Sequence, residues 1–190
     1  MKILVLDNYD SFTYNLVHLI TELGYGSQMD VYRNNKIDLK SIDSYDKILL
    51  SPGPGIPSEA GIMQEVIKTY GPKKSILGVC LGHQGIAEAY GGSLQNMTEV
   101  LHGIATKIKI LNGDPLFKDI PKELTVARYH SWTVVADSLP QEIEITAVDD
   151  NNLVMGIKHK IHDVKGVQFH PESFLTEYGK EMMINWLEGK

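Results

Sequence analysis

The sequence predicts an α/β fold with a mostly parallel central sheet, helices on both faces and a small antiparallel sheet. Two observations predict it. Short apolar runs alternate with helical patterns through the first half of the chain, and short alternating strands separated by turns follow between residues 92 and 148. Since 190 residues would leave two separate cores small, we expect a single domain over residues 1–190.

The first half of the chain reads as βαβ units. Such alternation favours a parallel sheet whose binding crevice lies at the carboxyl ends of the strands, and functional motifs should gather there. The expected strands are residues 3–6, a short one ending at 31, 47–50 and 76–79, and the expected helices are 12–23, 62–70 and about 83–90.

The second half predicts short antiparallel strands that form an insertion or an edge, followed by closing strands and a terminal helix. Asn-Gly-Asp-Pro and Leu-Pro turns interrupt the alternating segments. The expected antiparallel strands are 106–110, 124–129, 133–136 and 143–147, the closing strands 154–158 and 166–169, and the helix 174–187.

Composition excludes several classes of function. The net charge is −6 and the basic residues are scattered, so no nucleic-acid ligand is expected. The apolar run before Asp7 is far too short for a signal peptide or a membrane span, which predicts a cytoplasmic protein with no membrane partner. The single cysteine allows neither an intrachain disulfide nor a multi-cysteine metal site, and we expect no metal.

The only cysteine, Cys80, lies between a buried strand and a helix, with Gly78 and Gly82 two positions away on either side. This Gly-x-Cys-x-Gly spacing is typical of a nucleophile elbow, in which small neighbours permit a sharp turn that exposes the nucleophile. The helix N-terminus favours the thiolate. The alternative is that Cys80 is a small buried hydrophobic residue.

A histidine and a carboxylate stand two residues apart near the other end of the chain, with Pro171 between His170 and Glu172. The proline favours extended backbone, which places both side chains on one face. We therefore predict a triad in which His170 takes the proton of Cys80 and Glu172 orients the imidazole. Taken separately, His170 is better explained as a structural residue and Glu172 as a surface charge, and only their combination with Cys80 favours the triad.

Three segments together resemble the class I, triad-type glutamine amidotransferases. Two further segments resemble the chorismate-serving branch of that family, which contains anthranilate synthase component II and the aminodeoxychorismate synthase glutaminase. The first three are SPGPGIP at 51–57, GVCLGHQ at 78–84 and GVQFHPES at 166–173, and the other two are LDNYDSFTYN at 6–15 and RYHS at 128–131.

The resemblance implies a flavodoxin-like α/β fold and a glutaminase reaction that uses Cys80, His170 and Glu172. It implies backbone N–H groups of Gly53 and Leu81 as the oxyanion hole. The implied partners are L-glutamine and a chorismate-using synthase subunit in a hetero-oligomer, with no cofactor in this chain and Mg²⁺ on the partner. The positions that correspond to glutamine-binding residues are Gly53, Pro54, Gly55, Gln84, and the backbone of Ser131 and Trp132.

Two segments depart from the pattern of many relatives. This chain has Leu101-His102-Gly103-Ile104 where relatives have Met-His-Gly-Lys, and Trp132 where they often have Leu. The predicted function is the glutaminase subunit of anthranilate synthase in tryptophan biosynthesis. The alternatives are the aminodeoxychorismate synthase glutaminase of folate biosynthesis, one subunit shared by both synthases, a cysteine hydrolase that acts alone, and a catalytically silent binding module.

Overall fold

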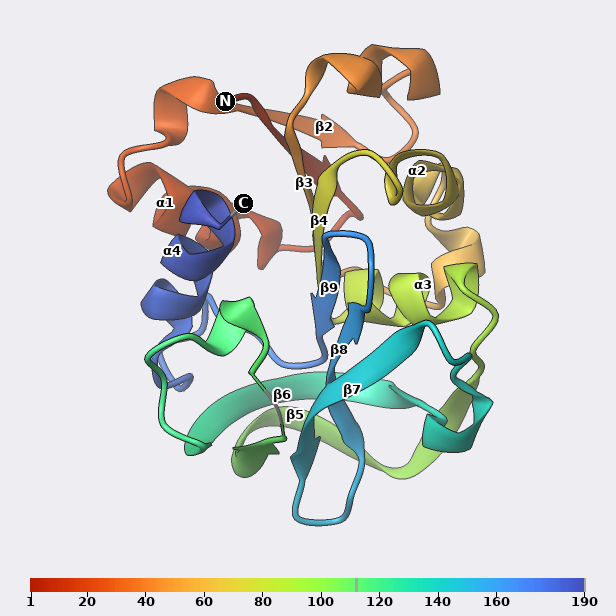
Figure 1. The fold of residues 1–190 in the computed structure, drawn as a ribbon, viewed down its shortest axis with the longest axis vertical. Coiled ribbons are helices and arrows are strands. Elements are labelled where there is room, and N and C mark those ends of the chain that lie inside the picture. The colour runs from red at the N-terminus through yellow and green to blue at the C-terminus, as the bar shows by residue number, and fades with distance from the viewer. Residues whose placement is uncertain (112, 190) are drawn as a thin grey trace.

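The strands of the computed structural model, which describes residues 1–111 and 113–189, join in one sheet with the order β2-β1-β3-β4-β9-β8-β7-β5-β6 (Figure 1). The strands are β1 Ile3–Asp7, β2 Met29–Arg33, β3 Lys47–Leu50, β4 Ser75–Val79, β5 Leu94–Ile110, β6 Glu123–Val134, β7 Ile143–Asp149, β8 Val154–His159 and β9 Val164–Val167. The α-helices are α1 Thr13–Glu22, α2 Met63–Tyr70, α3 Leu81–Ala89 and α4 Gly179–Glu188.

The parallel half of the sheet confirms the predicted fold class. Strands β2, β1, β3, β4 and β9 run parallel, and the apolar runs of β1, β3 and β4 are buried. Burial of both faces explains why these strands are continuously hydrophobic instead of alternating. Helices α1 and α4 cover one face and α2 and α3 the other (Figure 1).

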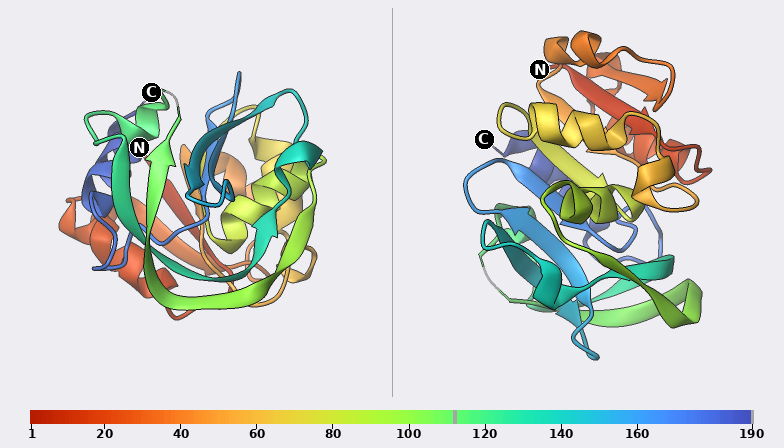
Figure 2. Two further views of the ribbon diagram at one scale, coloured as in Figure 1. Left: turned by 90° about the horizontal axis from the view of Figure 1, so that it is seen from below. Right: turned by 90° about the vertical axis from the view of Figure 1, so that its right-hand side faces the viewer.

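The antiparallel strands β8, β7, β5 and β6 continue the central sheet and do not form a separate one. Strands β5 and β6 make a long curved ribbon (Figure 2). The two strands predicted at 124–129 and 133–136 are a single strand, β6, and β5 begins at Leu94, well before the predicted 106. Backbone pairing between β5 and β6 holds these stretches extended although their polar side chains interrupt the hydrophobic alternation.

The last helix begins at Gly179, five residues later than the predicted start at 174. The segment before it folds into turns, because Ser173 N–H donates to the His170 carbonyl and Thr176 N–H to the Ser173 carbonyl. Tyr178 then has a φ of 58°, a left-handed conformation that separates the turns from the helix. Strand β9 ends at Val167, so Gln168 and Phe169 lie beyond it.

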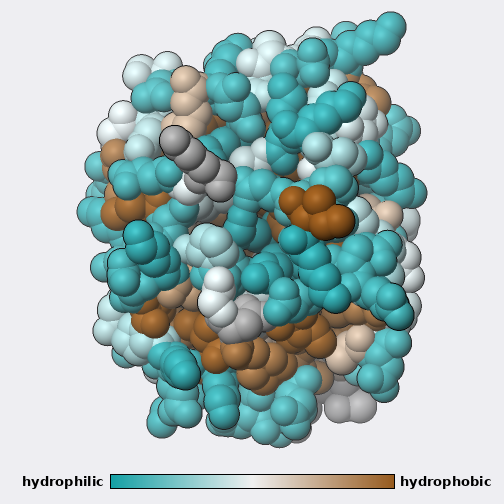
Figure 3. Space-filling view, in the orientation of Figure 1, coloured by the Kyte–Doolittle hydropathy of each residue, from teal (hydrophilic) through white to brown (hydrophobic). Residues whose placement is uncertain are grey.

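The surface seen in Figure 3 is mostly hydrophilic, with hydrophobic residues gathered in its lower part over the antiparallel strands. None of the helices within residues 1–111 and 113–189 is long and apolar enough to cross a membrane.

Candidate active site

The site forms where the parallel strands end, and Cys80 follows directly on β4. Its backbone has φ 52° and ψ −101°, a strained combination that the flanking glycines make possible. A Cβ at Gly78 would collide with the backbone of Gly82, and one at Gly82 would lie 2.5 Å from the Leu50 carbonyl oxygen. The predicted nucleophile elbow is therefore present, with Cys80 at the start of α3 and 6% exposed.

The Gly53 loop is held against the elbow by the segment that follows β1. Asn8 donates from its backbone N–H to Ser51 Oγ and from Nδ2 to the Ser51 carbonyl, both at 2.8 Å. A Cβ at Gly53 would lie 2.5 Å from Leu81 Cδ2 and 2.7 Å from Asn8 Cβ. Only glycine fits there, so the two predicted oxyanion donors, the N–H groups of Gly53 and Leu81, belong to adjoining segments.

His170 and Glu172 form the predicted pair. Nδ1 of His170 lies 2.7 Å from Oε1 of Glu172, and both side chains are buried. Burial by itself lowers the pKa of His170, but hydrogen bonding and charge from Cys80 and Glu172 outweigh it and raise that pKa to about 10. The imidazole of His170 is therefore protonated at neutral pH beside Cys80, and Glu172 is a buried partner and not a surface charge.

Strand β6 positions His170 from the side. His170 N–H donates to the Ala127 carbonyl, and Thr176 Oγ1 accepts from Ala127 N–H and donates to the His170 carbonyl. The rings of Phe12 and Tyr129 pack against the imidazole, with centroids 5.2 and 4.9 Å away. These contacts fix the orientation of the ring, and the sequence analysis did not identify them.

A cavity of about 180 Å³ opens beside Cys80. Gln84, at its wall, donates to the Trp132 carbonyl at 2.9 Å. The cavity brings together all of the residues that resemblance assigns to glutamine binding. Its lining is Gly53, Pro54, Gly55, Cys80, Gln84, Tyr129, His130, Ser131 and Trp132.

Gln168 is a site residue that the sequence reasoning missed. It is fully buried, its Nε2 donates to Cys80 Sγ at 3.7 Å, and its Oε1 accepts from Gln84 at 3.1 Å. Its position directly after β9, at the same sheet edge as Cys80, is the signal that could have identified it.

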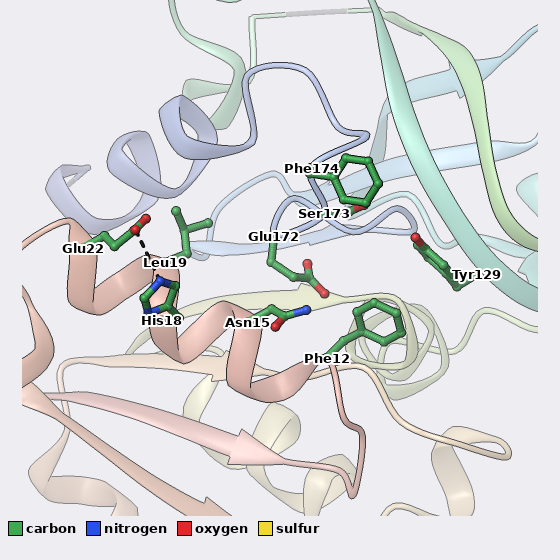
Figure 4. Close-up of a pocket in the computed structure, with 9 residues that line it drawn as sticks. All are labelled: Phe12, Asn15, His18, Leu19, Glu22, Tyr129, Glu172, Ser173 and Phe174. Carbon is green, nitrogen blue, oxygen red and sulfur yellow. Dashed lines mark ion pairs between the residues drawn. The ribbon is translucent and has the colours of Figure 1, made fainter.

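A larger hollow of about 380 Å³ lies on the other side of the triad, between α1 and the turns that follow β9. Figure 4 shows the Glu172 carboxylate facing Asn15 and Phe12 across it. Cys80 does not line this hollow, so the chemistry belongs to the smaller cavity.

Two further sequence expectations concern metals and the departures from the family pattern. The described residues contain no group of three His, Cys, Asp or Glu side chains placed to hold a metal ion. The side chains of Leu101 and His102 lie outside the described residues, and Ile104 is 44% exposed.

A strained cysteine at the wall of a small polar cavity, with a buried histidine–carboxylate pair beside it, defines an enzyme that transfers acyl groups through a thiol nucleophile. Comparison with known proteins gives its family. The model of the family "Glutamine amidotransferase class-I" matches residues 4–189. This chain therefore belongs to the class I glutamine amidotransferases.

The relatives and a solved structure agree with this assignment. Aminodeoxychorismate synthase component 2 of Escherichia coli is 46% identical over 97% of this chain and 98% of its own length. Aminodeoxychorismate/anthranilate synthase component 2 of Bacillus subtilis is 43% identical over 98% and 95%. The chain spans only 32% of the bifunctional protein TrpGD of Thermotoga maritima, at 45% identity. The structure of a putative GMP synthase subunit of Thermoplasma acidophilum is 29% identical with a TM-score of 0.88, covering 99% of this chain and 92% of that one.

Proposed function

We propose that this chain is the glutaminase subunit of anthranilate synthase, which hydrolyses L-glutamine and passes ammonia to a chorismate-binding synthase subunit. The observation that carries the proposal is the strained turn that presents Cys80 to the buried His170–Glu172 pair. This geometry supports a charged, activated nucleophile and opposes the silent-module alternative, because such strain persists mainly where function requires it.

The chemistry proceeds in two halves. The thiolate of Cys80 attacks the side-chain amide carbon of glutamine, and the C–N bond breaks as protonated His170 gives its proton to the leaving nitrogen. Ammonia and a γ-glutamyl thioester result. Water then attacks the thioester while His170 takes one of its protons, and the C–S bond breaks. Glutamate leaves, its new carboxyl group loses its proton to solvent, and the Cys80 thiolate reforms beside protonated His170. Glu172 keeps Nδ1 engaged, so proton transfer occurs at Nε2.

The Gly53 loop and the start of α3 stabilise the tetrahedral intermediates. Backbone N–H groups of Gly53 and Leu81 would donate to the oxyanion, and one such donor contributes about 2.7–4 kcal/mol to transition-state stabilisation. We assign Pro54, Gly55, Gln84 and the Ser131–Trp132 backbone to glutamine binding, supported by their common cavity.

A partner enzyme follows from the reaction itself, because ammonia released into water would be protonated and diluted. The relatives are named as components of synthases, which supports the choice of a synthase for that partner. We expect the partner to bind chorismate and Mg²⁺ and this chain to need no cofactor. A hetero-oligomer and a cytoplasmic location complete the proposal, and size-exclusion chromatography of the mixed subunits and cell fractionation test them.

The second candidate is the glutaminase of aminodeoxychorismate synthase, or one subunit that serves both synthases. The names of the relatives support this alternative. The Escherichia coli relative is named for aminodeoxychorismate synthase alone, and the Bacillus subtilis relative is named for both synthases. The glutaminase site is the same in either case, so only the synthase partner distinguishes them.

Ammonia release from glutamine tests the proposal, measured with the chain alone and with each synthase subunit plus chorismate. We expect slow release alone, faster release with the anthranilate subunit, and none with Cys80→Ser. Stimulation only by the aminodeoxychorismate subunit would assign the other branch. Equal rates with and without a partner would indicate a hydrolase that acts alone, and no release under any condition a silent module.

A further inference from the structure

A chain of buried polar groups runs from the end of β7 to the cavity beside Cys80. Asp149 Oδ2 accepts from Arg128 NH1 at 2.6 Å, and Arg128 Nε donates to Nε2 of His130 at 3.1 Å. Nδ1 of His130 lies 2.8 Å from the Trp132 carbonyl oxygen. Arg128, His130 and Trp132 alternate along β6, so their side chains share one face of the strand.

Arginine fixes the tautomer of His130. A guanidinium only donates hydrogen bonds, so Nε2 of His130 accepts and its proton is on Nδ1. Burial, and next the charge of Arg128, lower the pKa of His130 to about 4, which keeps the ring neutral. The Nδ1–H group can then donate to only one acceptor, the Trp132 carbonyl.

The same carbonyl also accepts from Gln84 Nε2 at 2.9 Å. Two donors, one from β6 and one from α3, therefore hold the backbone at Trp132 in one orientation at the wall of the cavity. Asp149 anchors the far end, because its Oδ1 accepts from the backbone N–H groups of Asn151 and Leu153 in the β7–β8 turn.

Three residues of this chain of polar groups, Asp149, Arg128 and His130, are only 2–6% exposed. Removing an ion pair from water costs free energy that a neutral apolar core would not require. None of Asp149, Arg128 and His130 belongs to the triad. The cost of burying them is explained if the order that they impose on Trp132 serves the substrate.

We propose that Asp149, Arg128 and His130 are positioning residues, a relay that sets the Trp132 backbone for binding the glutamine substrate. The proposal rests on the proposed function, since it deepens the glutamine site. The relay acts on binding and not on the thiol, so its loss should raise the glutamine KM and leave kcat nearly unchanged.

Two matched substitutions at His130 separate its hydrogen bond to the Trp132 carbonyl from its hydrogen bond to Arg128. In His130→Asn, the side-chain amide occupies the place of Nδ1 and can still donate to the Trp132 carbonyl. In His130→Gln, the amide reaches the place of Nε2 and leaves that carbonyl without its donor. With the synthase subunit that stimulates ammonia release, we expect a glutamine KM about tenfold higher for His130→Gln and about threefold or less for His130→Asn, with kcat within about twofold. Equal KM values in both variants, or no rise in either, would overturn the proposal.

Ring nitrogen NMR of the chain labelled with ¹⁵N-histidine gives a readout that does not depend on activity. We expect Nδ1 of His130 to carry the proton, because it faces the Trp132 carbonyl, and Nε2 to accept from Arg128. In the double variant Arg128→Met, Asp149→Asn, we expect the proton to stay on Nδ1 and the Nε2 resonance to shift toward that of a ring nitrogen without a donor. That double variant removes both charges, and Asn keeps an acceptor for the β7–β8 turn, so it should fold. A proton on Nε2 in the unsubstituted chain would disprove the relay. Absence of ammonia release by the unsubstituted complex would instead defeat the proposed function.

Discussion

The backbone at Cys80 shows how a single residue can trade stability for reactivity. A non-glycine residue at φ 52° and ψ −101° costs about 1–3 kcal/mol. This backbone conformation places the thiol at the first turn of α3, beside His170. The strained backbone conformation of Cys80 is therefore what positions its thiol for catalysis.

Substitution of Cys80 tests this strain directly. Alanine is normally more favourable than glycine by roughly 0.5–1 kcal/mol in regular structure. At position 80 we expect the reverse, with Cys80→Gly more stable than Cys80→Ala by about 1 kcal/mol or more, because glycine adopts positive φ without strain. Urea unfolding of the two inactive variants measures the difference, and alanine proving the more stable would show that the turn is relaxed.

The charge of Glu172 controls the pH range of the reaction. Since the pKa of His170 is raised to about 10, the imidazole is protonated below that pH and loses its proton as pH rises through it. The alkaline limb of kcat/KM should therefore lie near pH 10. Glu172→Gln removes a hydrogen bond and a charge that raise this pKa, so the limb should move to lower pH and kcat should fall by on the order of 10²–10⁴.

The matched control for that measurement is Glu65→Gln on α2, an exposed carboxylate away from the site. Its pH–rate profile should overlay that of the unsubstituted chain. An unshifted alkaline limb in Glu172→Gln would mean that the carboxylate does not govern the protonation of His170.

The triad was predictable from the sequence, but the residues that hold it were not. Motifs and spacing indicated Cys80, His170 and Glu172, because nucleophile and base chemistry restricts the residue types. Gln168 contacts Cys80, and Arg128 contacts Asp149, through side-chain bonds between elements that are distant in the chain. A polar residue in a strand gives no sign of whether its partner is water or a buried side chain.

At the scale of elements, the turns after β9 and strand β6 act as one unit. Thr176 joins them, since its hydroxyl accepts from Ala127 N–H at 3.0 Å and donates to the His170 carbonyl at 2.6 Å. The predicted helix start at 174 failed here because helical periodicity continues back through residues whose backbone groups are engaged by turns and by β6. Apart from the strands predicted at 124–129 and 133–136, which are the single strand β6, element order and type were predictable, and boundaries depended on such long-range bonds.

Substitution of Thr176 tests that unit. Thr176→Val keeps the shape but leaves the buried Ala127 N–H without its partner and leaves the His170 carbonyl with Ser173 N–H alone. This should cost about 1–3 kcal/mol of unfolding free energy and lower kcat as His170 shifts. Thr176→Ser keeps the hydroxyl and should retain most of both. The two variants are compared by urea unfolding and by ammonia release, and equal values for Val and Ser would remove Thr176 from the site.

At the scale of the whole molecule, the continuous sheet predicts cooperative unfolding. The two tryptophans report on different halves, since Trp132 lies on antiparallel β6, and Trp186 on α4 donates from Nε1 to Ser75 of parallel β4. If residues 1–190 form one domain, the variants Trp132→Phe and Trp186→Phe should each show a single transition that coincides with circular dichroism. The fluorescence and dichroism transitions are compared within each variant. Different midpoints for the two signals would reveal two units that unfold separately.

The place of β9 between β4 and β8 has a consequence for biosynthesis. The strand that completes the parallel half, and the histidine that follows it, are translated long after the elbow. A nascent chain on the ribosome therefore carries Cys80 without its base and cannot consume glutamine. Glutamine hydrolysis begins only when the segment that follows β8 has emerged and inserted, so incomplete translation products cannot release ammonia.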